Sequence, residues 1–285
     1  MKLLNHHYGK ARVRVMKVIR AGTRHALKEL SVSVMLKGEF DASYTRADNR
    51  LVVPTDSMKN TVYVLAKDEL GEENETFGLA VGEHFLQTYS QISEVVISLS
   101  ERTWDRMSLA GQPHPHSFLQ NSPAQPTCRL VCSRTGLSVE SGIEDLLLLK
   151  TTGSGFEGYV KDKYTTLPET RDRILATKLK AVWSYAQTPS SYSCTNKKIL
   201  EAMLAVFADT YSPSVQVTLF QMGEAALKIA PEVSEIHLAM PNKHCLLVNL
   251  APFGLKNENE VFVPTDEPHG QIEGTVTRDD GAVGA

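Results

Sequence analysis

Cysteine is scarce in this chain, which has four among its 285 residues, at positions 128, 132, 194 and 245. The spacing of the four matches neither a disulfide framework nor a paired-cysteine metal motif. The sequence therefore predicts free thiols in a reducing compartment, and it argues against a small domain that is held together by disulfides.

Long apolar runs and an excess of charge are also missing. No run approaches the about 20 apolar residues that cross a membrane, and residues 1–7 lack the apolar region of a signal peptide. A net charge of −3 gives no basic footprint for nucleic acid. The last residues do not form a Ser-Lys-Leu type of peroxisomal signal. We therefore expect a cytoplasmic protein that binds neither nucleic acid nor membrane.

The composition, 42% hydrophobic and 22% charged, is that of a globular protein. In the first half, alternating apolar residues predict strands, and apolar residues three and four apart predict helices. Thr55 or Asp56 is expected to cap the first helix, and a second helix carries Phe77 and Tyr89. The predicted strands cover 8–19, 29–36, 95–99 and, after a turn at 113–116, a strand from 117 that resumes over 128–134.

The second half repeats this order. Strands are expected at 146–149 and 179–185, although the second segment also fits a helix. Helices are expected after a cap at Thr195-Asn196 and after Ser214, and strands at 236–240 and 247–250. Short matches lie in the same order in both halves: Thr55-Asp56 with Thr195-Asn196, Ile92–Val95 with Val233–Ile236, and Pro113 and His116 with Pro241 and His244.

We therefore predict an α+β fold of two tandem antiparallel ββααββ modules, residues 1–136 and 137–278, with a flexible tail at 279–285. Each module would carry its two helices on one face of a sheet. The other face and the sheet edges must also be covered. Modules from several subunits can cover them by closing into barrels, so an oligomer is expected.

Several short motifs occur in a fixed order along the chain: Tyr8-Gly9-Lys10, Val53–Ser57, Lys59–Thr61, Pro113–Phe118, Tyr164–Leu167, Arg171–Leu175, Ser214–Gln216 and Pro241–His244. Together they resemble the urate oxidase (uricase) family. The resemblance implies the tunnelling fold and a homotetramer with active sites at subunit interfaces. It also implies oxidation of urate by dioxygen and water to 5-hydroxyisourate and hydrogen peroxide in purine degradation, without a metal or an organic cofactor.

The resemblance further implies how urate is held. Arg173 and Gln216 would bind its edge, because a guanidinium fork matches two acceptors and an amide matches an amide-like ring edge. Phe156 would stack on the ring, with Leu167 nearby. Because a helix N-terminus attracts anions, backbone N–H groups would complete the site, those of Thr55, Asp56 and Val215.

Proton transfer is implied for a triad of Lys10, Thr55 and His244, in which His244 would be the pH-sensitive member. Asn242, with Thr55, would line the site of dioxygen or water. In the family pattern Lys10, Thr55 and Asp56 come from one subunit, and the other site residues come from its neighbour. Glu157, beside the stacking position, departs from that pattern.

Two alternatives remain open from the residues. A metal-dependent pterin or purine enzyme of the same fold would use His114 and His116, with a third ligand such as His84. A non-catalytic purine-binding assembly protein would keep only Arg173 and Gln216. We expect no metal site, because two histidines alone are a weak metal signal.

Overall fold

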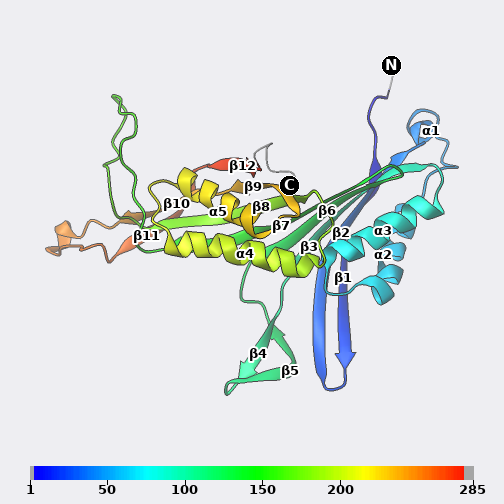
Figure 1. Cartoon of the computed structure of the whole chain (residues 1–285), viewed down its shortest axis with the longest axis horizontal. Helices are drawn as coiled ribbons and strands as arrows, with labels where there is room; N and C mark the ends of the chain where they lie inside the picture. The colour runs from blue at the N-terminus through cyan, green and yellow to red at the C-terminus, as the bar shows by residue number, and fades with distance from the viewer. Residues whose placement is uncertain (1–2, 279–285) are drawn as a thin grey trace. The chain divides into compact units, whose positions relative to one another are not determined.

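The computed structural model describes residues 3–278, and the predicted tail at 279–285 lies outside the described residues. The chain divides into two compact units (Figure 1). Unit 1 comprises the residues up to Ile143 together with Thr188–Ser193. Unit 2 comprises Glu144–Gln187 and the residues from Cys194 onward.

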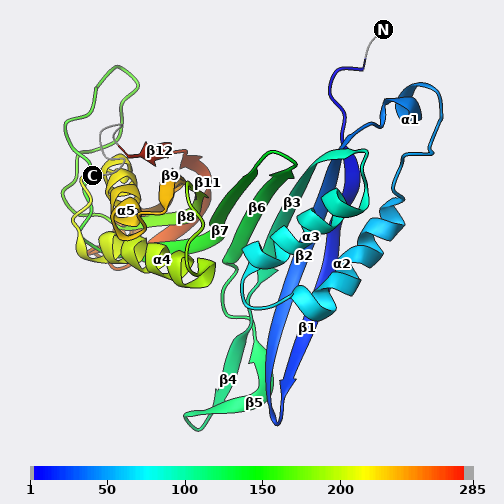
Figure 2. The ribbon, with the colours of Figure 1, turned by 45° about the vertical axis from the view of Figure 1, so that its right-hand side comes forward.

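Unit 1 is an antiparallel sheet that carries two long helices on one face (Figure 2). The strands follow the order β1 (Tyr8–Ala21), β2 (Arg24–Gly38), β3 (Ile92–Arg102) and β6 (Gln125–Ser133). The helices are α2 (Thr55–Glu69) and α3 (Asn74–Thr88), preceded by the short α1 (Asp41–Thr45). A separate hairpin, β4 (Asp105–Leu109) with β5 (Gln112–Leu119), lies in the chain between β3 and β6.

The core of unit 1 follows from the alternation in its strands. Val32, Val34 and Ile97 are fully buried, as are Phe77 and Phe85 of α3. Each such side chain contributes about 1.5–3 kcal/mol when it leaves water. The intervening strand residues are polar, for example at 31, 33 and 98, and point to the opposite face of the sheet.

Unit 2 is also an antiparallel sheet with two helices, α4 (Tyr192–Asp209) and α5 (Val215–Ile229) (Figure 1). Strand β7 (Leu137–Lys150) begins in unit 1 and lies beside β8 (Leu175–Tyr185). Strand β8 pairs with both β9 (Val233–Ala239) and β10 (Asn242–Leu247). Their outer partners are β12 (Glu273–Thr277) for β9 and β11 (Phe262–Gly270) for β10. A single 3-10 turn, η1 (Ala251–Phe253), follows β10.

The α+β class, the antiparallel sheets and the helices predicted from Thr55, around Phe77 and after Ser214 are confirmed. The segment 179–185 is a strand, paired along its length with β9. Other expectations were wrong. Residues 113–116 lie inside β5 rather than in a turn. Both strands of a two-stranded hairpin are edge strands, and an edge strand tolerates proline although proline has no N–H to donate.

Three other differences concern the second half. The strand predicted at 247–250 was wrong: β10 ends at Leu247, residues 248–250 are in no strand, and the chain turns into the proline-containing 3-10 helix Ala251–Phe253. Helix α4 starts at Tyr192, so Thr195-Asn196 lies within its first turns and does not cap it. Asn196 instead accepts hydrogen bonds from Trp183 Nε1 and from the Tyr185 hydroxyl, at 3.0 and 2.6 Å. Strands β11 and β12 were not anticipated, because prolines at 264 and 268 interrupt the alternation in β11, and β12 has only five residues with Gly274 among them.

Candidate functional site

The start of α2 has no side-chain cap. Pro54 occupies the N-cap position and Thr55 is the first helical residue, so the prediction that Thr55 or Asp56 caps the helix was wrong. A proline side chain has no oxygen that could accept from the helix. The backbone N–H groups of Thr55 and Asp56 therefore have no acceptor within the helix, and they favour an anion at this end.

Lys10 lies near this helix start. The Tyr8 hydroxyl accepts from the N–H of Val53 at 2.8 Å and donates to its carbonyl at 3.2 Å, which fixes the residues before α2 against β1. The pKa of Asp56 is lowered mainly by the hydrogen bond from Lys59, and also by the positive charge of Lys10. Unit 1 thus gathers Lys10, Thr55 and Asp56.

A backbone irregularity adjoins Lys10. The pairing of β1 with β2 shifts register between Lys10 and Val13, and Arg12 has a φ of 57°, which residues other than glycine rarely adopt. The Arg12 N–H donates to Ser33 Oγ at 3.1 Å. Bulges of this kind redirect side chains and occur often beside functional sites.

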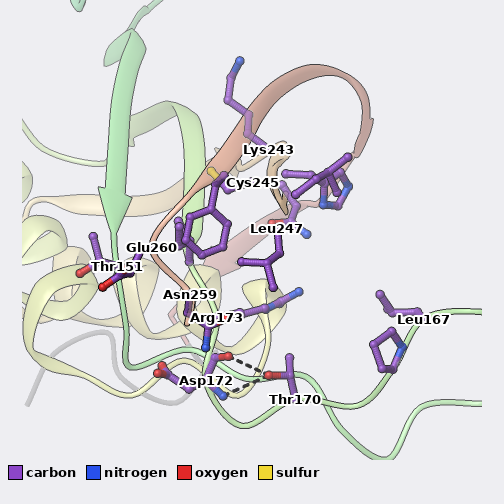
Figure 3. A pocket seen from close by; sticks show the side chains of 16 residues that line it. Thr151, Leu167, Thr170, Asp172, Arg173, Lys243, Cys245, Leu247, Asn259 and Glu260 are labelled. Atoms are coloured by element: carbon purple, nitrogen blue, oxygen red, sulfur yellow. Dashed lines mark hydrogen bonds between the residues drawn. The ribbon is translucent and has the colours of Figure 1, made fainter. Parts of the chain in front are cut away.

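Unit 2 contains a cavity of about 610 Å³ (Figure 3). Its wall is built from the segment before β8, from β10 and from the start of β11. In Figure 3 the Arg173 side chain extends into the cavity, whose wall also includes Leu167 and Leu247. Asn242 and His244 line the same cavity. Four of the predicted site residues therefore share one space.

The side chain of Arg173 lacks a hydrogen-bond partner for one of its donors. Its backbone N–H donates to the Ser154 carbonyl at 2.8 Å, and its guanidinium carbon lies 5.4 Å from the centre of the Phe156 ring. Its Nε is buried and finds no acceptor within residues 3–278. Burial lowers the pKa of Arg173, and Tyr211 opposes this shift. A buried donor without a partner is costly, so an anionic acceptor would relieve the cost.

Phe156 is tied to the residues that precede α5. It exchanges backbone hydrogen bonds with Thr170, at 2.7 and 3.1 Å, and the N–H of Gly155 donates to the Ser212 carbonyl at 2.8 Å. A Cβ at position 155 would meet the Tyr211 hydroxyl and, at 2.9 Å, the Thr170 carbonyl, so only glycine fits. This close approach at Gly155 holds Phe156, the residue expected to stack on the substrate, beside the residues that precede α5.

Helix α5 starts with two predicted site residues. Ser214 is its N-cap and accepts from the N–H of Val217 at 3.3 Å. Val215 is buried and Gln216 is exposed. The N–H groups of these first two helical residues lie before the first intrahelical bond. They form a second helix N-terminus with free donors.

Asn242 and His244 occupy alternate positions on β10, with Lys243 between them turned to an ion pair with Asp266. The pairing of β10 with β11 shifts register between Asn242 and His244. Thr265 Oγ1 donates to the His244 carbonyl at 3.1 Å. As at Lys10, the predicted proton-transfer residue lies beside a bulge.

The predicted residues thus form two groups. The unit 1 group holds Lys10, Thr55 and Asp56, and the unit 2 group holds Phe156, Leu167, Arg173, Val215, Gln216, Asn242 and His244. Sequence reasoning missed the cavity residues on or before β11, namely Asn259, Glu260 and Phe262. A prediction of β11 would have found Phe262, but its proline-interrupted pattern gave no signal.

His114 and His116 have a different setting. Their rings lie 4.6 Å apart in an edge-to-face arrangement, and the His25 ring is 5.9 Å from that of His116. Arg106 donates to the carbonyls of His114 and Pro115 at 2.7 Å, and also to that of His25. Over residues 3–278 no group of three or more His, Cys, Asp or Glu side chains suits a metal ion.

Comparisons with known proteins agree with one another. The family model for uricase matches residues 6–131 and 139–273. The uricase of Arthrobacter globiformis is 41% identical over 272 residues, which cover 95% of this chain and 88% of that protein. The uricase of Dictyostelium discoideum is 40% identical over 279 residues, which cover 97% of each.

Solved structures give the same result. The crystal structure of the Arthrobacter globiformis uricase matches with a TM-score of 0.93 at 39% identity, covering 100% of this chain and 98% of that one. A uricase from Bacillus fastidious matches with a TM-score of 0.85 at 26% identity, covering 96% and 94%. Within residues 3–278, no helix is both long and apolar enough to cross a membrane.

Proposed function

The chain belongs to the uricase family, and from this premise we propose that urate reacts where unit 1 of one subunit meets unit 2 of another. The enzyme is a urate oxidase: urate, dioxygen and water give 5-hydroxyisourate and hydrogen peroxide. The family match favours neither a metal-dependent pterin enzyme nor a non-catalytic assembly protein. What remains to be assigned is the role of each residue.

The observation that carries the assignment is the unit 2 cavity, where the half-buried guanidinium of Arg173 lies over the Phe156 ring. Urate is a flat anion with carbonyl acceptors along its edge. Arg173 binds two of these acceptors through its fork, and this also satisfies its buried Nε. Gln216 donates and accepts at the next stretch of the edge. Phe156 stacks on the ring face, and Leu167 closes the cavity wall.

Backbone N–H donors complete the proposed binding site for the urate anion. The N–H group of Val215 at the start of α5 comes from the same subunit as Arg173. Those of Thr55 and Asp56 at the uncapped start of α2 come from the neighbouring subunit. Both helix ends bring positive dipole potential to the substrate. This arrangement favours the urate anion over a neutral purine.

Proton transfer is assigned to Lys10, Thr55 and His244. The urate monoanion must lose a further proton before electrons pass to dioxygen. Thr55, Lys10 and, from the other subunit, His244 form the relay that carries this proton away from the urate ring. Asn242 holds dioxygen or water above the ring by hydrogen bonds. No cofactor takes part in this proposal, because the urate dianion is itself the electron donor.

The proposed assembly is a homotetramer of tunnelling-fold subunits. Each unit supplies one ββααββ module, β1-β2-α2-α3-β3-β6 in unit 1 and β7-β8-α4-α5 with β9 to β12 in unit 2. Large apolar side chains are more than a third exposed on α5 and on the β10–β11 pair, at Val217, Phe220, Leu246, Leu247 and Val263. Such exposure is typical of surfaces that a partner covers.

The test is aerobic and anaerobic incubation of chelator-treated enzyme with urate. We expect urate absorbance to fall only with dioxygen, with one peroxide released per urate consumed. Loss of turnover after dialysis against a chelator, restored by one metal, would contradict the cofactor-free proposal. Urate binding without peroxide release would favour the assembly-protein alternative.

A further inference from the structure

Tyr159 lies against the aromatic ring that we assign to substrate stacking. The ring centres of Phe156 and Tyr159 are 4.8 Å apart and the ring planes differ by 12°. This is a parallel stack within the distance range of favourable aromatic pairs. One face of Phe156 is therefore covered by Tyr159, so a flat substrate that stacks on Phe156 must share the other face with the guanidinium of Arg173, whose carbon is 5.4 Å from the ring centre.

The hydroxyl of Tyr159 has a separate contact. It donates to the backbone carbonyl of Leu167 at 2.5 Å. Leu167 lines the cavity that holds Arg173. One side chain thus touches two residues of the proposed site, Phe156 through its ring and Leu167 through its hydroxyl.

The surrounding segment is cross-linked so that this contact is held in place. Glu157 accepts from Arg171 Nε at 3.0 Å, and the N–H of Gly158 donates to Glu169 at 3.1 Å. Lys161 pairs with Glu169 at 3.0 Å. These bonds join the two limbs of the segment 156–171 on either side of Tyr159. They also give Glu157, which departs from the family pattern, a defined partner.

We propose that Tyr159 is a positioning residue for substrate binding: it supports Phe156 from behind and holds Leu167 at the cavity wall. The inference rests on the proposed function, because it assumes that Phe156 stacks on urate. An unsupported Phe156 would sample several rotamers, and fixing it on binding would cost side-chain entropy. Tyr159 removes that cost before urate arrives. It does not touch the reacting atoms, so it acts on binding and not on the chemical step.

The experiment compares Tyr159→Phe, Tyr159→Leu and Tyr159→Ala in the full-length enzyme. KM and kcat are measured with urate, and the Kd of xanthine, a flat purine that lacks the 8-oxo group, is measured by calorimetry without turnover. Tyr159→Leu and Tyr159→Ala should raise KM and the xanthine Kd between about two-fold and about ten-fold, with kcat changed less than KM. Tyr159→Phe keeps the stack but loses the hydrogen bond to the Leu167 carbonyl, so its KM and xanthine Kd should lie between those of the wild type and Tyr159→Leu.

Tyr164→Ala is the matched control, because Tyr164 lies in the same segment and is 77% exposed. It should leave KM, kcat and the xanthine Kd unchanged. If Tyr159→Ala is poorly folded, the comparison of Tyr159→Phe with Tyr159→Leu decides. Equal KM values for the wild type and Tyr159→Leu would overturn the inference, as would a fall in kcat alone. A wild type that releases no peroxide from urate would instead overturn the proposed function.

Discussion

Arg173 has a buried side-chain donor without a hydrogen-bond partner within residues 3–278. Its guanidinium is partly buried over Phe156, and its Nε finds no acceptor in the part of the chain that the structure describes. Burial lowers its pKa, which means that its charged form loses favourable hydration. A residue held in this way is poor for stability and well suited to bind an anion.

Replacing Arg173 by alanine should weaken urate binding much more than it slows the chemical step. Loss of a charge-assisted contact of about 1.5–3 kcal/mol predicts a rise in KM of about 10-fold to 150-fold. Because the buried Nε of Arg173 has no acceptor within residues 3–278, the thermal unfolding midpoint should not fall. Steady-state kinetics and calorimetric unfolding measure the two effects.

Arg173→Lys is the control for this change, since it keeps the charge and loses the planar fork. Its KM should lie between those of the wild type and Arg173→Ala. If Arg173→Ala binds urate with the apparent affinity of the wild type, the proposed binding of urate by Arg173 is wrong.

Substitution of Thr55 should have the opposite effect, on kcat rather than on KM. Thr55→Ala removes the hydroxyl but keeps the backbone N–H at the start of α2, so kcat should fall by about 100-fold while KM changes little. Thr55→Ser retains a hydroxyl and should recover most of the rate. A Thr55→Ala enzyme with wild-type kcat in a stopped-flow assay would exclude the hydroxyl from proton transfer.

At the scale of elements, the start of α3 anchors the segment that leads into α4. Glu73 accepts hydrogen bonds from the Ser191 hydroxyl at 2.7 Å, the Ser193 N–H at 3.1 Å and the Thr76 hydroxyl at 3.0 Å. Burial alone would raise the pKa of Glu73, but these bonds together outweigh burial and lower it. The ionised carboxylate is therefore the form that holds the segment.

This lowered pKa predicts a pH dependence of stability. Since the folded-state pKa lies below the unfolded value, the contribution of Glu73 is present above the unfolded pKa and disappears as the pH falls through the folded pKa. Glu73→Gln should lower the free energy of unfolding at pH 7 by about 1–2 kcal/mol. The difference from the wild type should shrink below about pH 4.

Denaturant titrations at several pH values measure this difference. Glu72→Gln is the matched control, because Glu72 is exposed and only its backbone carbonyl is used, as the acceptor for Lys28. If the difference in free energy of unfolding between the wild type and Glu73→Gln stays constant from pH 7 to pH 3, the ionised Glu73 carboxylate is not the stabilising form.

Most elements could be predicted from periodicity, since helices such as α2 and strands such as β2 bury one regular face. Two of the failures share a cause. Strand β11 and residues 113–116 of β5 contain prolines, which local rules read as breaks. Helix α4 starts three residues before Thr195, and Asn196 accepts hydrogen bonds from Trp183 and Tyr185, contacts that local sequence rules do not show.

At the scale of the whole molecule, the site residues fall into two groups in two units. If one subunit supplies Thr55 and its neighbour supplies Arg173, Thr55→Ala and Arg173→Ala subunits should complement each other when activity is measured at a urate concentration far below the KM of Arg173→Ala, where both variants alone are nearly inactive. Each mixed pair has one site with both residues intact and one with both replaced. Random mixing of equal amounts should therefore restore about one quarter of the wild-type activity.

The measurement requires dissociating and reassembling the two variants together, with each variant reassembled alone as the control. Mass analysis should show tetramers in all three samples. A mixture that stays as inactive as its parents, although hybrid tetramers form, would place Thr55 and Arg173 in the same subunit's site.

The fold class, most elements and the family follow from the order of residues alone, because side-chain periodicity and short ordered motifs are local properties. The residue types that can bind a flat anion are also visible there. Packing sets which of these residues share a space. It brought Leu167, Arg173, Asn242 and His244 to one cavity, put Pro54 and not Thr55 at the cap of α2, and set Tyr159 behind Phe156. These are contacts between segments with no common period, and they exist only after the chain has packed.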